Sequence, residues 1–191
     1  MKKIFLIFVL FFGSINILNA ETNRIVAGNK DAKITIIAYE SLTCSHCADF
    51  HREVYPQLKK NYIDTGLAKI EFRHFPLDIA AFNASKVAQC KSDESLKILN
   101  SLYSNQQEWV RGNTVEEIND NLKKFIKNQG FEVNFEKCIN DKKIEDYVLN
   151  DRIEGTKKFK VNATPTIIIN DEKFDKTLNY KNLKKSLEKL I

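Results

Sequence analysis

Two cysteines three positions apart, Cys44 and Cys47, enclose a serine and a histidine, His46. Thiols at this spacing can form a redox-active disulfide, bind a metal ion or crosslink the chain. A structural crosslink is disfavoured, because a bridge that closes so short a loop constrains the unfolded chain very little. A metal site would use both cysteines and His51, but no second C-x-x-C or H-x-x-x-H motif supplies a fourth ligand. The spacing therefore favours a redox pair, and we expect no metal.

Cys44 stands at a predicted junction between a strand and a helix. The β-branched apolar run at 32–40 predicts a buried strand. A helix is predicted directly after it, because apolar side chains recur at spacings of three and four: Cys47, Phe50, Val54, Leu58 and Tyr62. The unpaired N–H groups and the dipole at a helix N-terminus stabilise a thiolate and lower its pKa. We predict that Cys44 is the nucleophile, that His46 tunes its pKa, and that the buried Cys47 is the resolving thiol.

Strand patterns lie on both sides of a long middle segment. A strand predicted at 67–75 completes a β–α–β unit with the first strand and helix, and Pro56 should kink that helix. A further strand is predicted at 166–169, and NDEKF looks like a tight turn into an edge strand. The chain then continues as an amphipathic helix, whose apolar face carries Leu183, Leu187 and Leu190.

The middle segment shows helical periodicity and no convincing strand. Thr114 and Glu117 form a capping box for its third helix, Gly130 ends that helix, and Trp109 is expected in the core; the four predicted helices are 79–90, 93–108, 114–129 and 134–158. Such a block is too long for a loop. The order of elements predicts an α/β protein with a thioredoxin fold and an inserted helical subdomain at about 78–158.

Composition and the N-terminus indicate where the protein works. The formal net charge is +5, but the charges alternate in sign, so no basic block exists for nucleic acid. Residues 1–20 read as a signal peptide: two lysines, an apolar run too short to span a bilayer, and a small residue, Ala20. An uncleaved membrane anchor is the alternative. We expect a mature thioredoxin-like domain at 21–191, exported to the periplasm.

The two remaining cysteines, Cys90 and Cys138, lie in the helical block. The number of cysteines is even and the expected compartment is oxidising, so the simplest pairing joins these two to each other. Closing so long a loop would contribute roughly 4 kcal/mol on the chain-entropy model. We predict a structural disulfide; two free buried thiols or a second redox pair remain open. His74, on the second strand, is expected to be a partly buried core residue, and His51 a structural one.

Three segments together resemble a known family: SLTCSHCADFH, FRHFPLD and VNATPTIIIN. They are similar to the DsbA-like thiol:disulfide oxidoreductases of the thioredoxin superfamily, in particular the short alpha-proteobacterial type. The resemblance implies that Pro165 is a cis-proline beside the redox cysteines and that Thr164 offers backbone groups to an extended substrate. It also implies the activity: the oxidation of reduced exported proteins in the periplasm, reoxidation by a DsbB-like membrane protein, and no bound cofactor.

One position departs from the pattern of thioredoxin-fold oxidoreductases. These proteins often place a buried acid six residues before the first cysteine, where it helps to move the proton of the resolving thiol. That position is Ala38 here, and Glu40 follows two residues later on the same face of the strand. We therefore predict that Glu40 partly replaces the missing acid as a proton relay, or that water carries the proton.

Two other functions remain open on the sequence. A disulfide reductase or isomerase of the same fold is one, because a threonine before the cis-proline occurs in isomerases of the wider superfamily. A secreted chaperone or binding protein is the other, although the intact Cys44 and Cys47 argue against it. Isomerases usually dimerise through a separate domain, and none fits before Ile25, which argues against an isomerase. We expect the protein to be a monomer.

Overall fold

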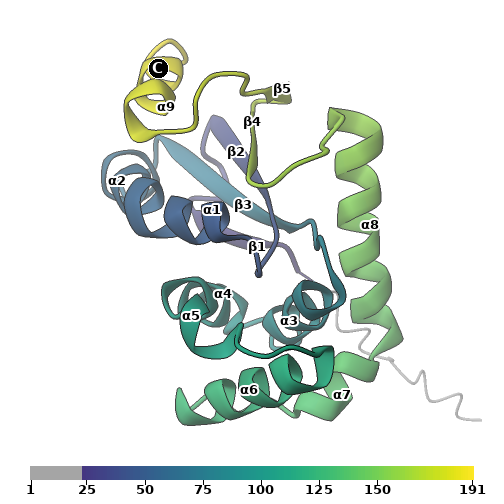
Figure 1. The fold of residues 1–191 in the computed structure, drawn as a ribbon. Helices are drawn as coiled ribbons and strands as arrows, with labels where there is room; N and C mark the ends of the chain where they lie inside the picture. Colours follow the sequence, from purple (N-terminus) through teal and green to yellow (C-terminus); the bar gives the residue numbers. More distant parts are fainter. Residues whose placement is uncertain (1–22) are drawn as a thin grey trace, which may run out of the picture.

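The computed structural model describes residues 23–191 (Figure 1). The expected signal peptide at 1–20 therefore lies outside the described residues. None of the helices in residues 23–191 combines the length and the apolar composition that crossing a bilayer requires.

A five-stranded mixed sheet forms the centre of the molecule. Its order is β1-β3-β2-β4-β5, and the strands are β1 Ile25–Gly28, β2 Ile34–Glu40, β3 Ala68–His74, β4 Thr166–Ile169 and β5 Glu172–Lys173. Strand β3 is parallel to β2 and antiparallel to β1, and β4 is antiparallel to both β2 and β5. Strand β1 was not predicted, because four residues ending in glycine show no readable alternation.

The helix after β2 is continuous but irregular. It consists of α1 Ser45–Asp49, a π-helical turn Phe50–Val54, α2 Tyr55–Leu58 and a second π-helical turn Lys59–Ile63. Pro56 lies in the first turn of α2, directly after the first wide turn. A proline removes one N–H from the hydrogen-bonding pattern of a helix, and π-helical turns are a recognised site of helix bending. The structure shows a π-helical turn directly before α2, and the kink at Pro56 remains a prediction.

The predicted helical block is present, with two extra breaks. Its helices are α3 Ile79–Gln89, α4 Ser95–Ser104, α5 Gln106–Trp109, α6 Val115–Asn128, α7 Phe135–Asn140 and α8 Lys142–Phe159. The helix predicted at 93–108 ends at Asn105, whose backbone is not helical, and the one at 134–158 is interrupted at the extended Asp141. Asp141 accepts a hydrogen bond from the N–H of Ile144 and so caps α8. The spacing of apolar residues does not reveal a single polar residue that leaves the helical conformation and caps the next helix, so these two breaks were not predicted.

The caps of α6 follow the sequence closely. The Thr114 side chain accepts a hydrogen bond from the N–H of Glu117, as predicted. The Glu117 carboxylate, however, accepts from the N–H of Asn113, one residue earlier than a capping box requires. Gly130 follows the helix with a φ of 77°, the left-handed conformation that glycine adopts freely.

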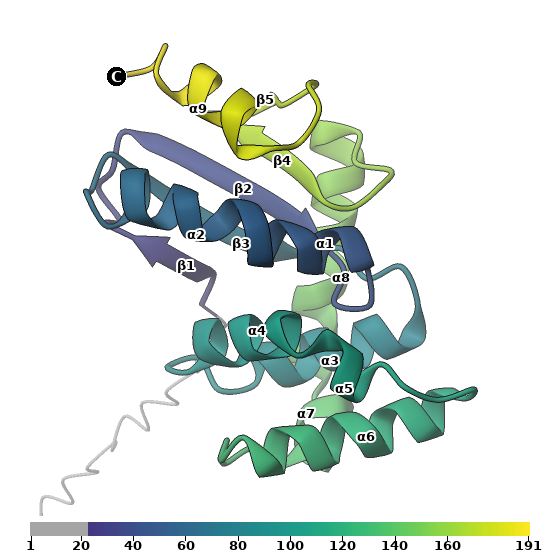
Figure 2. The ribbon, with the colours of Figure 1, turned by 60° about the vertical axis from the view of Figure 1, so that its left-hand side comes forward.

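Helices cover both faces of the sheet. Ile36 and Ala38 point into the main core, which the helix after β2, α9 Tyr180–Leu187 and much of the helical block complete. Ile37 and Tyr39, with the opposite parity on β2, pack against the end of α8. Figure 1 shows α8 running along the molecule beside the sheet, and Figure 2 shows α1 and α2 lying across it. The junction between β2 and α1, which carries Cys44, therefore lies between the sheet and the helical block.

Three core predictions have different outcomes. Trp109 is fully buried and its ring N–H donates to the carbonyl of Leu102, so it belongs to the core as expected. His74 is more deeply buried than predicted, with Nε2 3.1 Å from the Gln89 side-chain oxygen. Leu190 is exposed rather than buried, because α9 ends at Leu187 and the chain leaves the helical path.

Candidate active site

Cys44 lies immediately before the first residue of α1. It is the N-cap residue, in extended conformation, and its carbonyl accepts hydrogen bonds from the N–H groups of Cys47 and Ala48. Both Cys44 and Cys47 are free thiols; Cys44 is partly exposed, and Cys47 is fully buried on the inner face of the helix. The predicted strand-to-helix junction is thus present, with one thiol facing solvent and the other sealed behind it.

The two thiols have opposite pKa shifts. The pKa of Cys44 is lowered to about 5, chiefly because the Cys47 thiol donates a hydrogen bond to its sulfur and because the backbone N–H groups of His46 and Cys47 add to this. The pKa of Cys47 is strongly raised, first by burial, then by its donation to Cys44 and by the charge of Glu40. At neutral pH, Cys44 is therefore a thiolate and Cys47 a thiol.

The loop before β4 approaches the first cysteine. The Thr164–Pro165 peptide bond is cis, and Cys44 Sγ lies 3.4 Å from the carbonyl oxygen of Thr164. A shallow groove beside this contact is lined by side chains of the α1 region and of the loops around β4 and β5: His46, Asp49, Phe50, Glu53, Val54, Thr164, Pro165 and Leu178. Residues 120 positions apart in the chain thus meet at one sulfur atom.

His46 reaches Cys44 through its backbone rather than its ring. The ring is 82 % exposed, and its Nδ1 lies 3.8 Å from the carboxylate of Asp49. The leading influences on the Cys44 pKa include the backbone N–H of His46, and none of them is the imidazole charge. A tuning role for the side chain therefore remains a prediction.

Glu40 is paired with His51, a contact that the sequence reasoning missed. Oε2 of Glu40 lies 2.8 Å from Nε2 of His51, and both side chains are 3 % exposed. Burial raises the pKa of Glu40, and His51 opposes that shift. Glu40 is also close enough to the thiols for its charge to raise the pKa of Cys47. The predicted face of Glu40 is right, but His51, expected to be merely structural, is its hydrogen-bonding partner.

Gln106 is a second residue that no sequence pattern pointed to. It is buried in α5, and its side-chain amide donates to the carbonyls of Leu42, at 2.8 Å, and Cys44, at 3.0 Å. The helical block therefore holds the turn that carries the nucleophile. A lone glutamine in a helical pattern gives no signal of such a contact, because only the packing of the block against β2 brings it there.

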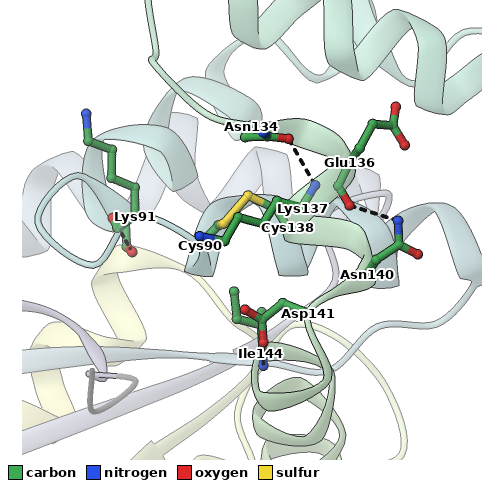
Figure 3. The surroundings of a disulfide bond; sticks show 10 residues. Cys90, Lys91, Asn134, Glu136, Lys137, Cys138, Asn140, Asp141 and Ile144 are labelled. Carbon is green, nitrogen blue, oxygen red and sulfur yellow. Dashed lines mark hydrogen bonds between the residues drawn. A yellow bond between two sulfur atoms is a disulfide. The ribbon is translucent and has the colours of Figure 1, made fainter. Parts of the chain in front are cut away.

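The other two cysteines form a disulfide outside this site. Cys90, after the last residue of α3, is bonded to Cys138 in α7 (Figure 3). Cys138 is fully buried, and Cys90 is partly exposed. The bond joins two helices of the inserted block. Among residues 23–191, no group of histidine, cysteine and acidic side chains is arranged to hold a metal ion.

Among family models, the one described as Thioredoxin matches residues 20–189. The chain belongs to the thioredoxin family. Its described structure superposes on the crystal structure of Wolbachia pipientis alpha-DsbA1 with a TM-score of 0.78 at 30 % identity, covering 91 % of this chain and 93 % of that one. This thioredoxin-family chain therefore has the predicted fold with its helical insertion, and its resemblance to the DsbA-like proteins is confirmed.

Curated relatives of this thioredoxin-family chain carry related names. A provisionally named protein-disulfide oxidoreductase of Rickettsia bellii is 32 % identical over 152 residues, which are 78 % of this chain and 58 % of the relative. Disulfide bond formation protein D of Bacillus subtilis is 26 % identical, over 86 % of this chain and 75 % of the relative. The chain thus spans somewhat less than two thirds of the length of the rickettsial relatives it matches.

Proposed function

We propose that this chain is a thiol:disulfide oxidoreductase that introduces disulfide bonds into exported proteins in the periplasm through the Cys44–Cys47 pair. The observation that supports this most is the contrast between the two thiols. Cys44 is partly exposed, has a pKa lowered to about 5 and lies against the carbonyl of Thr164, whereas Cys47 is buried with a raised pKa. The Cys44 sulfur is therefore suited to be attacked by a substrate thiolate and to act as a leaving group. The Cys47 sulfur is suited to re-form the Cys44–Cys47 disulfide.

In the proposed reaction, a substrate thiolate attacks Cys44 in the Cys44–Cys47 disulfide, and Cys47 leaves and takes up a proton. The second substrate thiolate then attacks the substrate sulfur of the mixed disulfide, and Cys44 leaves as a thiolate. Two electrons pass from the substrate dithiol to the cysteine pair. A thiolate of low pKa is a good leaving group and stabilises the reduced pair, so the disulfide becomes a stronger oxidant.

Substrate binding is proposed for the groove beside Cys44. The backbone of Thr164 and the ring of Pro165 stand next to the sulfur, so an extended peptide whose cysteine reaches Cys44 must pass over them. The partners would be reduced exported proteins and, for reoxidation, a DsbB-like membrane protein. The name of the Bacillus subtilis relative, disulfide bond formation protein D, supports this direction of electron flow. The protein is expected to act as a monomer.

The equilibrium of the Cys44–Cys47 pair with reduced and oxidised glutathione tests the proposal. The lowered pKa of Cys44 predicts that the pair stays reduced at glutathione ratios that would oxidise a thioredoxin. Alkylation of free thiols followed by mass spectrometry would give the fraction of protein in which the Cys44–Cys47 pair is reduced. Cys44→Ser, which retains the Cys90–Cys138 bond, is the control that shows which of the two disulfides exchanges with glutathione. An equilibrium like that of thioredoxin would contradict the oxidase and favour a reductase. Normal activity of Cys44→Ser in a cell-based disulfide assay would instead favour a chaperone or binding protein.

A further inference from the structure

Two ionisable side chains close to Cys47 form a contact that is sealed from solvent. Glu40 Oε2 and His51 Nε2 are 2.8 Å apart at the end of β2 and in the helix that carries Cys47. The other carboxyl oxygen, Glu40 Oε1, is also buried, and the hydroxyl of Tyr103 is a second group that hydrogen-bonds this carboxylate. A buried carboxyl whose neighbours hold it next to the thiol is well placed to accept or release a proton.

Aromatic rings hold the His51 imidazole in place. It stacks on Tyr103 of α4, with ring centroids 4.0 Å apart and planes at 17°. Phe72 of β3 and Tyr55 of α2 contact it at centroid distances of 5.1 Å and 5.5 Å. A ring packed on several sides cannot turn freely, so the nitrogen that faces Glu40 stays there and water is kept out.

We propose that Glu40 and His51 form one proton-holding unit for Cys47, in which His51 is the positioning residue. When a thiolate opens the Cys44–Cys47 disulfide, the unit gives its proton to the Cys47 sulfur. When Cys47 attacks a mixed disulfide at Cys44, the unit takes that proton, and the departing thiolate is protonated from solvent. The unit itself is neither oxidised nor reduced. This inference rests on the proposed function and adds to it the second residue that serves the resolving thiol.

The surroundings explain why one carboxyl alone would serve poorly. Burial raises the pKa of Glu40 and so works against the carboxylate that must accept a proton, whereas the charge and hydrogen bond of His51 restore it. The other ionisable groups facing this pair are Cys44, Cys47, Tyr55 and Tyr103. Burial raises the pKa of Tyr55 to about 12 and that of Tyr103 well above its usual value, so both tyrosines stay neutral at the pH of an assay.

The closing step isolates the proposed proton transfer. The purified protein is converted to the mixed disulfide between Cys44 and glutathione, and the first-order release of glutathione by Cys47 is followed against pH. Glu40→Gln cannot accept a proton, so we expect release to slow by about tenfold or more and to lose its dependence on the Glu40 carboxyl. His51→Gln keeps a hydrogen-bond donor but no positive charge, so the Glu40 pKa should rise and the profile should move to higher pH.

A matched control separates this role from loss of any buried histidine. His74 is also buried, bonds to Gln89 and lies outside the proposed unit, so His74→Gln should keep the pH profile of the unsubstituted protein. If His51→Gln also keeps that profile, His51 is only structural and the proposal is overturned. Failure of the unsubstituted protein to release glutathione at all would instead overturn the proposed function, before any variant is compared.

A second measurement serves if His51→Gln does not fold. In the unsubstituted protein at one pH, the ring nitrogen resonances of His51 should change between the disulfide and dithiol forms, because the unit has given up its proton to Cys47. The resonances of His74 provide the reference. A change at His51 no larger than the one at His74 would overturn the proposal.

Discussion

At the scale of single residues, Cys44 and Cys47 show how position within one helical turn makes two identical side chains chemically different. Cys44 precedes the helix, where backbone N–H groups and the neighbouring thiol point at its sulfur. Cys47 is one turn further and is buried in the core, where loss of solvation disfavours a negative charge. The first sulfur is therefore stabilised as an anion, and the second is kept as a thiol.

The pH dependence of alkylation tests this difference. Because the thiolate reacts and the thiol does not, the rate at which iodoacetamide modifies Cys44 should rise with pH and level off above a midpoint near pH 5. Cys47 should remain unmodified over the same range, since its pKa is raised. Mass spectrometry of each cysteine peptide provides the measurement, and Cys44→Ser should abolish the reaction. A midpoint near that of an ordinary thiol, about 8.5, would contradict the assignment.

At the scale of secondary structure elements, the inserted helices hold the active-site turn as well as enlarging the core. Helix α5 is short, but Gln106 projects from it to the carbonyls of Leu42 and Cys44. Helix α8 lies so close to β2 that Gly155 faces the ring of Tyr39. These two contacts fix the turn and the strand that lead into Cys44 and Cys47.

Replacing Gln106 should loosen the turn that carries Cys44. Gln106→Ala leaves the buried carbonyl of Leu42 without its donor, so we expect a loss of roughly 1–3 kcal/mol in the free energy of unfolding. The release of glutathione from Cys44 should also slow, because the attacked sulfur is less well positioned. Gln107→Ala is the matched control, since that neighbouring side chain is exposed. Equal unfolding curves for the two variants would refute the role given to Gln106.

Gly155 is required for the close approach of α8 to the sheet. A Cβ at this position would lie 2.8 Å from Cε1 of Tyr39, which is too close for unstrained contact. Gly155→Ala should therefore destabilise the protein by roughly 1–3 kcal/mol in denaturant unfolding, although the same change usually favours a helix. Thr156→Ala, on the exposed side of α8, should have a much smaller effect. A stabilised Gly155→Ala would show that α8 can move away without cost.

At the scale of the whole molecule, one continuous core joins the sheet to the helical block. Leu102, Trp109 and Leu122 from the block belong to the same buried cluster as Ile36 and Ile70 from the sheet. The disulfide between Cys90 and Cys138 then crosslinks the block itself, which contains most of the helices that the fold adds to the thioredoxin core. The insertion and the sheet are therefore expected to unfold together.

We predict that removing the Cys90–Cys138 disulfide weakens the fold and leaves the thiol chemistry of Cys44 and Cys47 intact. In the chain-entropy model, a loop of 48 residues contributes roughly 4 kcal/mol to the free energy of unfolding. We expect Cys90→Ala/Cys138→Ala to lose up to that amount in denaturant unfolding, while the glutathione equilibrium of Cys44 and Cys47 changes little. A folded double variant without thiol exchange would show instead that Cys90 and Cys138 are a second redox pair.

The sequence by itself determined the features that local patterns encode. The spacing of Cys44 and Cys47, the strand before them and the helix after them lie within one continuous stretch, and apolar periodicity reveals such elements directly. The order of units then indicated the thioredoxin fold and its insertion. Strand β1 and the break at Asn105 were not predicted, because a four-residue strand and a single non-helical residue contain too few positions to form a recognisable pattern.

Only the tertiary structure decided which distant groups meet. His51 lies 11 positions from Glu40, Gln106 62 positions from Cys44, and Thr164 120 positions from Cys44. Each contact depends on how a helix packs on the sheet or how a loop folds back, and side-chain spacing along the chain carries no record of either. The sequence could therefore name the two thiols proposed as the redox pair, whereas the partner of Glu40 and the support of the Cys44 turn followed from packing alone.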